Sequence, residues 1–138
     1  MRPVAEALKA LGSEQAMVVA SRDGLDEMSL SASTVVARLS KGRVTMEEIR
    51  PERLGLKKRP LSALRGGDAK RNAAITRAIL YGAKGAAREV CVLNAAAALM
   101  VAGLARNWRE GLALSAASID SGRAAAALAI LVHLTKRG

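Results

Sequence analysis

The sequence predicts an α/β fold in which a few strands, including a hairpin, precede a C-terminal group of helices. Three observations lead to this prediction. Short apolar runs with polar boundaries occupy the first half of the chain, a Ser-Lys-Gly turn joins two of them, and the segments after residue 68 have the length and composition of helices. At 138 residues the chain has the length of one domain and can bury a core.

The N-terminal half is expected to contain one helix and three strands. Val4 to Leu11 predicts a short helix that Gly12 ends in a left-handed conformation. The apolar run Gln15 to Ala20 has polar boundaries, which is typical of a buried strand. Ser33 to Leu39 and Arg43 to Ile49 are predicted to form the two strands of the hairpin.

A charged connector, Pro51 to Pro60, leads to the predicted helices. Asp68 is a suitable N-cap for the first of them, Ala69 to Tyr81, and Gly82 can close it. Asn107 and Glu110 have the spacing of a capping box. The remaining helices are expected over Val90 to Val101, from Asn107 to about Ile119, and over Gly122 to Leu134. The second of the four is apolar on most faces, so it is expected to be buried on several sides.

The composition indicates a cytoplasmic protein without a membrane span. The longest apolar run, Val90 to Ala105, is shorter than the ~20 residues of a membrane helix and is broken by Asn94 and Gly103. The N-terminus has no apolar signal-peptide region. Cys91, the single cysteine, cannot form an internal disulfide, which fits a reducing compartment, and we interpret it as a small core residue.

The candidate site is the stretch from Asp23 to Glu27, directly after the first predicted strand. Adjacent side chains on a regular strand point to opposite faces, so Asp26 and Glu27 can meet one ion only if the backbone turns, which Gly24 permits. Mg²⁺ takes oxygen ligands and usually keeps several waters, so two carboxylates and substrate phosphates complete its shell. The alternative interpretation is two solvated acids in a surface loop.

Three downstream segments occur with this acidic stretch in a recognisable order: Gly66 to Ala73, Leu93 to Leu99 and Ala117 to Gly122. In this order and spacing the segments resemble the C-terminal part of the α/β domain of the anthranilate phosphoribosyltransferase family. This family belongs to the nucleoside phosphorylase/phosphoribosyltransferase superfamily and acts in tryptophan biosynthesis. The resemblance runs over almost the whole chain, and it begins at Pro3 to Leu8 and Leu11 to Ser13, which resemble the helix before the family's central strand.

The resemblance implies a chemistry and assigns residues to it. The family transfers the phosphoribosyl group of phosphoribosyl pyrophosphate to the amino group of anthranilate and releases pyrophosphate. Asp26 and Glu27 match the family's acidic pair for Mg²⁺, whereas Asp23 and Gly24 match the turn before it and are expected to shape the loop. No catalytic residue is implied in this chain.

The chain also differs from the family. Its 138 residues contain neither the N-terminal helical domain, nor the Gly-Thr-Gly-Gly-Asp loop that holds pyrophosphate, nor the Lys-His-Gly-Asn segment. Many relatives have His-Gly where this chain has Ala20-Ser21, and a Gly-Pro-Thr sequence after the acidic pair, where this chain has Ser29 to Thr34. Residues 1–138 are therefore expected to form a partial domain, as a fragment, a split-gene product or a decayed copy. Such a chain is expected to be inactive alone and to associate with itself or with a complementary chain through exposed apolar helices.

A second function class remains open because the net charge is +10. Part of this excess lies in one connector, at Arg50, Arg53, Lys57, Lys58, Arg59 and Arg65. Such a cluster can attract nucleic acid without reading its sequence, although the near absence of aromatic residues argues against base stacking. A non-catalytic nucleic-acid-binding module and an inactive remnant without a ligand are therefore the alternatives.

Other polar residues have structural interpretations. Asn94, within the Ala-rich run, is expected to be a buried hydrogen-bonding anchor, because an unpaired amide there would be costly. Trp108 is expected to pack against the core, and His133 is expected to be packed or partly exposed rather than a ligand. Gly66 to Asp68 is interpreted as a turn with an N-cap rather than as a phosphate site.

Overall fold

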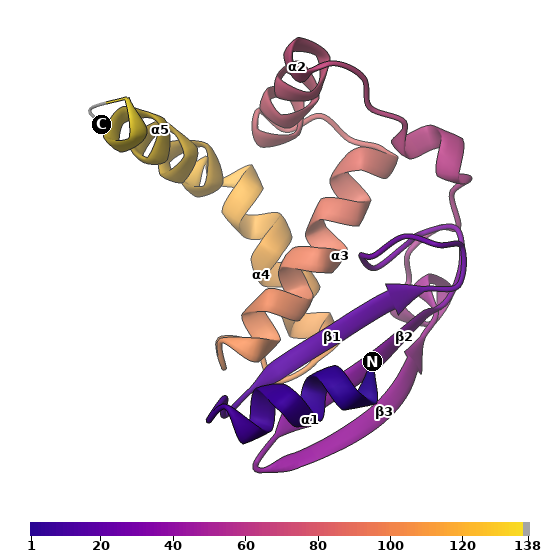
Figure 1. Ribbon diagram of the computed structural model, residues 1–138. Coiled ribbons are helices and arrows are strands. Elements are labelled where there is room, and N and C mark those ends of the chain that lie inside the picture. Colours follow the sequence, from indigo (N-terminus) through magenta and orange to yellow (C-terminus); the bar gives the residue numbers. More distant parts are fainter. Residues whose placement is uncertain (137–138) are drawn as a thin grey trace.

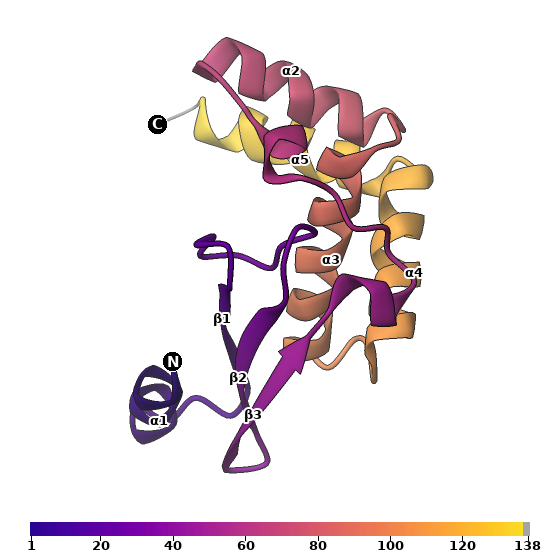
Figure 2. The same cartoon turned by 90° about the vertical axis from the view of Figure 1, so that its right-hand side faces the viewer.

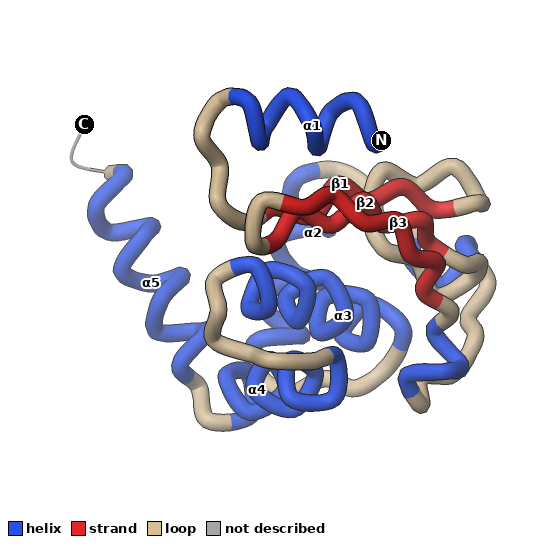
Figure 3. The backbone as a smooth tube through the Cα atoms, turned by 90° about the horizontal axis from the view of Figure 1, so that it is seen from below, coloured by secondary structure: helices blue, strands red, loops and turns tan. Residues whose placement is uncertain are grey.

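The computed structural model describes residues 1–136 and contains a three-stranded antiparallel sheet covered by helices (Figure 1). The strands β1 (Ala16–Ser21), β2 (Thr34–Ser40) and β3 (Arg43–Ile49) lie side by side in sequence order. Helix α1 (Arg2–Ala10) lies on one face of this sheet and α3 (Ala86–Val101) on the other (Figure 3). The predicted α/β fold, with its strands followed by helices, is confirmed.

The predicted hairpin is confirmed, with its turn at the expected residues. Ser40 is paired with Arg43, so Lys41 and Gly42 form a two-residue loop. Both residues have positive φ, 49° for Lys41 and 70° for Gly42. Such a turn follows the right-handed twist of the two strands, and the glycine adopts it without steric cost.

The expectation that the first strand is buried is wrong. Among the described residues, 1–136, strand β1 pairs only with β2, so one of its edges has no strand beside it, and its residues from Ala16 to Ala20 are only half-buried. The sequence could not reveal this, because an apolar run has the same composition at an edge as in the centre of a sheet. The opposite edge strand, β3, carries Arg43, Glu47 and Glu48, the kind of charged residues that discourage further strand pairing.

Helix α1 begins at Arg2, two residues before the predicted start, and ends where Gly12 was expected to stop it. Gly12 has φ 90°, and its N–H donates to the carbonyl of Lys9 at 3.0 Å. Ala5 is fully buried where α1 faces the sheet. The C-terminal glycine cap is therefore confirmed.

The charged connector contains two short 3-10 helices, η1 (Pro51–Leu54) and η2 (Leu61–Leu64), before α2 (Ala69–Leu80) begins. The Asp68 side chain accepts a hydrogen bond from the N–H of Arg71 at 2.7 Å, so the predicted N-cap of α2 is confirmed. The connector wraps around one side of α3 and brings α2 to the end of the molecule opposite α1 (Figure 2).

Helix α4 (Trp108–Asp120) begins at a cap close to the predicted capping box. The Asn107 side chain accepts from the N–H of Glu110 at 3.0 Å. The Glu110 carboxylate, however, accepts from the N–H of Arg106 rather than from that of Asn107. In a standard capping box the Glu110 carboxylate would accept from the N-cap residue itself, so here its bond is shifted by one residue toward the N-terminus.

Helix α3 is the centre of the fold, and it begins at Ala86, four residues before the predicted start. The core cluster consists of Met28, Leu30, Leu93 and Ala97, and Trp108 packs against it as expected. Helix α4 crosses α3 closely, because a Cβ added to Gly111 would lie 3.0 Å from the Ala96 carbonyl oxygen. One face of α3 is thus fully buried.

The other face of α3 is open. Cys91, Ala95 and Ala98 are exposed, so the prediction that Cys91 is a core residue is wrong, and the helix is not buried on all sides. The physical reason is that the chain supplies a sheet against one face and only part of a helix layer against the other. Small apolar residues therefore remain at the surface.

Helix α5 (Arg123–Thr135) extends away from the sheet at the far end of α4 (Figure 1). None of its residues is buried, and His133 is exposed. Among residues 1–136 no single helix is long and apolar enough to cross a membrane, although α4 and α5, bent by 66° at their junction, meet the length and composition test as a pair.

Candidate metal-binding loop

The candidate site lies in the loop of residues 22–33, hereafter the acidic loop, which connects β1 to β2 at the end of the sheet opposite the hairpin turn. The loop rises from the sheet and lies against α3 (Figure 2). Although it has no regular secondary structure, Met28, Ser29 and Leu30 within it are fully buried. Its shape is therefore set by tertiary contacts as well as by local turns.

The first half of the acidic loop is a tight turn. The Ser21 N–H donates to the Leu25 carbonyl at 2.9 Å, and the Gly24 N–H donates to the Ser21 carbonyl at 3.2 Å. Gly24 has φ 95°, a conformation that a residue with a side chain rarely adopts. Leu25 is thus held to the end of β1, immediately before the acidic pair.

Asp23 is the centre of a polar cluster inside the loop. Its carboxylate accepts hydrogen bonds from the Ser29 hydroxyl at 2.6 Å, from the Ser31 hydroxyl, and from the Leu25 N–H at 3.3 Å. Partial burial raises the pKa of Asp23, but hydrogen bonds, of which those from Ser29 and Ser31 are the strongest, outweigh this and lower it to about 2. The carboxylate is therefore charged at neutral pH and occupied by internal donors.

Asn94 of α3 anchors the second half of the loop. Its side-chain oxygen accepts the Met28 N–H at 3.0 Å, and its side-chain nitrogen donates to the Met28 carbonyl at 3.0 Å. The same nitrogen also donates to the carbonyl of Val90, at 3.0 Å. The expected hydrogen bonds are confirmed, with the main partner 66 residues away in the sequence, but Asn94 is half-buried rather than buried.

A third attachment comes from the connector. The Arg59 N–H donates to the Leu30 carbonyl at 3.0 Å, and the Arg59 guanidinium forms two hydrogen bonds to the Glu89 carboxylate at 3.0 and 3.1 Å. Hydrogen bonding to Arg59 lowers the pKa of Glu89. Of the basic residues in the connector, Arg59 is therefore engaged in holding the fold together, and its charge is largely neutralised locally.

Asp26 and Glu27 project from this fastened loop. Both are exposed, and they lie between two anchored residues, Leu25 and Met28. Among residues 1–136 no three His, Cys, Asp or Glu side chains gather into a metal-binding group. Asp26 and Glu27 are thus a pair of carboxylates, and such a pair suits an ion such as Mg²⁺ that keeps waters and binds substrate phosphates.

The sequence prediction named the acidic pair and its turn, but it missed the serines. Ser29 and Ser31 bond to Asp23, and the Thr34 hydroxyl accepts the N–H of Ser29 at 3.2 Å. The density of hydroxyl residues from 29 to 34 was the available signal, because such side chains bond to nearby backbone and carboxylate groups in loops.

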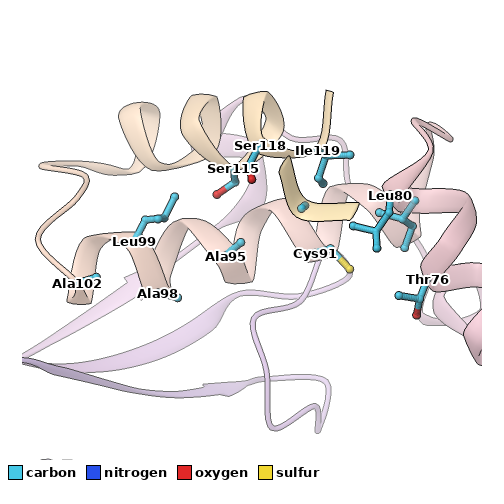
Figure 4. Close-up of a pocket in the computed structure, with 12 residues that line it drawn as sticks. Thr76, Leu80, Cys91, Ala95, Ala98, Leu99, Ala102, Ser115, Ser118 and Ile119 are labelled. Carbon is cyan, nitrogen blue, oxygen red and sulfur yellow. The ribbon is translucent and has the colours of Figure 1, made fainter. Parts of the chain in front are cut away.

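A separate apolar pocket of about 510 Å³ lies on the open face of α3, between α2, α4 and the start of α5 (Figure 4). Its lining includes Cys91, Ala95, Ala98, Leu99 and Ile119 and contains no charged side chain. The pocket does not include any residue of the acidic loop. It offers mainly apolar surface, without a carboxylate or imidazole for acid, base or metal chemistry.

Comparison with known proteins identifies relatives of this arrangement. The model of the glycosyl transferase family, a/b domain, matches residues 1–125. Anthranilate phosphoribosyltransferase from Azorhizobium caulinodans is 53% identical over 136 residues, which is 99% of this chain and 40% of that protein. The same enzyme from Rhodopseudomonas palustris is 52% identical over 98% of this chain and 40% of its own length.

Solved structures agree. The crystal structure of anthranilate phosphoribosyltransferase from Thermus thermophilus matches 87% of this chain and 35% of its own length, with TM-score 0.78 and 38% identity. The enzyme from Saccharomyces cerevisiae in complex with PRPP (phosphoribosyl pyrophosphate) and Mg matches 92% of this chain and 37% of its own length, with TM-score 0.81 and 25% identity. The chain spans about 40% of the length of the curated relatives it matches. These similarities favour the phosphoribosyltransferase interpretation over the nucleic-acid-binding module.

Proposed function

This chain belongs to the glycosyl transferase family, a/b domain, and from that premise we propose that it supplies the magnesium-binding part of an anthranilate phosphoribosyltransferase site. In this proposal Asp26 and Glu27 bind Mg²⁺ together with phosphoribosyl pyrophosphate. Residues 1–138 form part of the α/β domain of such an enzyme, and anthranilate is the acceptor. The expected location is the cytoplasm, where Cys91 would stay reduced.

The observation that carries the proposal is the way in which the acidic pair is presented. Both side chains are exposed, while the residues on either side are bonded to β1 and to α3. A loop fastened in this way holds the backbone of the acidic pair in place before the ligand arrives, so little backbone ordering entropy is lost on binding. Exposure leaves room for the waters and phosphate oxygens that Mg²⁺ requires.

The residues of the loop have different parts in this mechanism. Mg²⁺, when bound, would neutralise the charge that develops on the leaving pyrophosphate. Asp26 and Glu27 would hold the ion. Asp23 shapes the loop instead of binding the ion, because internal hydroxyl and N–H donors already occupy its carboxylate. The Gly24 turn fixes the direction in which the pair projects.

Transfer itself is expected to require groups that residues 1–138 do not contain. The glycine-rich pyrophosphate loop expected from the family resemblance is not among them. We therefore expect this stretch to bind metal and pyrophosphate-bearing ligand weakly and to show no turnover by itself. Mixing it with a chain that carries the remaining part of a relative should restore transfer.

Calorimetric titration with phosphoribosyl pyrophosphate and Mg²⁺ tests the proposal. Binding should be lost in Asp26→Ala with Glu27→Ala. The control is Glu6→Ala with Glu14→Ala, which removes two exposed carboxylates, one on α1 and one in the loop that follows it. Equal loss in both double variants would attribute the effect to net charge and contradict the proposal. Absence of binding in the folded parent chain would contradict it directly.

A further inference from the structure

We propose that Asn94 is the positioning residue for the acidic pair: its side chain fixes the loop backbone so that Asp26 and Glu27 are held ready for the metal. This inference rests on the proposed function and adds a residue, on α3, that lies outside the loop. Asn94 touches neither metal nor substrate in this account. It acts through Met28, the residue that follows Glu27.

The geometry allows only one orientation of the Asn94 amide. The side-chain nitrogen donates to the carbonyls of Met28 and Val90, and the oxygen accepts the Met28 N–H. Exchanging oxygen and nitrogen would place two donors or two acceptors against each other at all three contacts. The bond to Val90, within the same helix, thus orients the amide so that it pairs with both backbone groups of Met28.

The position of Met28 controls the acidic pair because Met28 cannot move independently of the core. Its side chain is fully buried in the cluster that contains Leu93, the residue before Asn94. On the other side of the pair, Leu25 is bonded to the end of β1. Asp26 and Glu27 therefore span a short gap between two fixed points, one on the sheet and one on α3.

A purely structural role for Asn94 predicts something different. If the amide only satisfied buried backbone groups, its loss would destabilise the fold without a specific effect on metal binding. The chain contains a matched control for this alternative. The Asn72 amide pairs in the same way with Gly67, accepting its N–H at 2.8 Å and donating to its carbonyl at 2.9 Å, in a segment without the acidic pair.

The experiment compares Asn94→Leu with Asn72→Leu in the chain of residues 1–138. Mn²⁺ alone is the probe, and the paramagnetic relaxation of the amides of Asp26 and Glu27 measures its dissociation constant at the loop. Hydrogen exchange of the Met28 amide reports independently on the loop backbone. We expect Asn94→Leu to weaken Mn²⁺ binding by about 10- to 100-fold, the usual effect of losing a group that orients a metal ligand. Asn72→Leu should change it less than about twofold, within the spread expected of a distant, uncoupled site.

The outcomes separate the two claims. Faster exchange at Met28 with unchanged Mn²⁺ affinity would overturn the positioning role and leave the proposed function intact. No relaxation effect at Asp26 and Glu27 in the parent chain would instead reject the proposed function, and the positioning role with it. Should Asn94→Leu fail to fold, Asn94→Gln decides, because the longer amide keeps its chemistry but cannot make all three bonds, and a loss of Mn²⁺ affinity is again expected.

Discussion

The acidic loop and helix α5 differ in burial, and in both the burial is the opposite of what the composition suggests. The loop, residues 22–33, is rich in serine and carboxylate side chains, yet Met28, Ser29 and Leu30 in it are fully buried. Helix α5 is almost entirely apolar, yet none of its residues is buried, and Ile130, Leu131 and Leu134 are each more than half exposed. Burial in this chain thus follows the available partners more closely than it follows hydropathy.

The difference shows which regions find their packing and hydrogen-bonding partners within this chain. Strands β1 and β2, the connector and α3 all bond to the acidic loop, so several of its backbone groups are paired within the chain. Helix α5 has its main contacts with α4 and α2. Exposed apolar surface of this kind is typical of regions that associate with a partner or aggregate. The expectation that the chain associates through its apolar helices stays a prediction.

The largest effect should come from removing the core beneath the loop. Leu93 is fully buried and packs with Met28, so Leu93→Ala should lower the free energy of unfolding by about 2–5 kcal/mol. Urea denaturation followed by circular dichroism measures this loss. Leu131→Ala on α5 is the matched control and should change the value by less than about 0.5 kcal/mol. Similar losses in both variants would break the contrast between the two regions.

The next effect concerns the pH dependence of the loop. Asp23 has a folded pKa of about 2 against an ordinary value of 3.8, so its contribution to stability is present above pH 4 and is lost as the pH falls toward 2. Because the group is only partly buried, we expect a contribution of about 1–2 kcal/mol. Asp23→Asn should reduce the fall in stability between pH 4 and pH 2, measured by urea denaturation at each pH. An unchanged pH profile would contradict this role.

A smaller effect is expected from the attachment of the connector. Arg59 and Glu89 form a bidentate pair whose side chains are 34% and 27% exposed. Their coupling should be about 0.5–1 kcal/mol, at the upper end for partly exposed pairs because of its two-bond geometry. A double-mutant cycle with Arg59→Gln and Glu89→Gln measures it. A coupling near zero would contradict a stabilising role for the Arg59–Glu89 pair.

The smallest effect on stability, and the clearest effect on association, should come from α5. Ile130→Lys combined with Leu134→Lys should change the free energy of unfolding by less than about 0.5 kcal/mol per site, because both side chains are largely exposed. Sedimentation velocity should show less self-association than in the parent chain. A parent chain that sediments as a monomer at all concentrations would contradict association through this helix.

The local signals in the sequence identified most elements but not their surroundings. The hairpin turn at Lys41 and Gly42 and the caps at Gly12, Asp68 and Asn107 depend on the residue itself and its immediate neighbours, so they could be predicted. The burial of β1 could not be predicted, because it depends on whether a further strand lies beside it. The same holds for Cys91, whose exposure depends on what covers the open face of α3.

For the site, the sequence by itself determined the acidic pair, the glycine that lets the chain turn before it, and the resemblance that suggests Mg²⁺. These depend on residue type and order. Only the tertiary structure decided that the Asp23 carboxylate accepts hydrogen bonds from Ser29 and Ser31. It also decided that Asn94 bonds to the backbone of Met28, the residue after Glu27. The reason is physical: a hydrogen bond is satisfied by whichever donor and acceptor the fold brings together, and Asn94 and Met28 meet only after α3 has packed against the sheet.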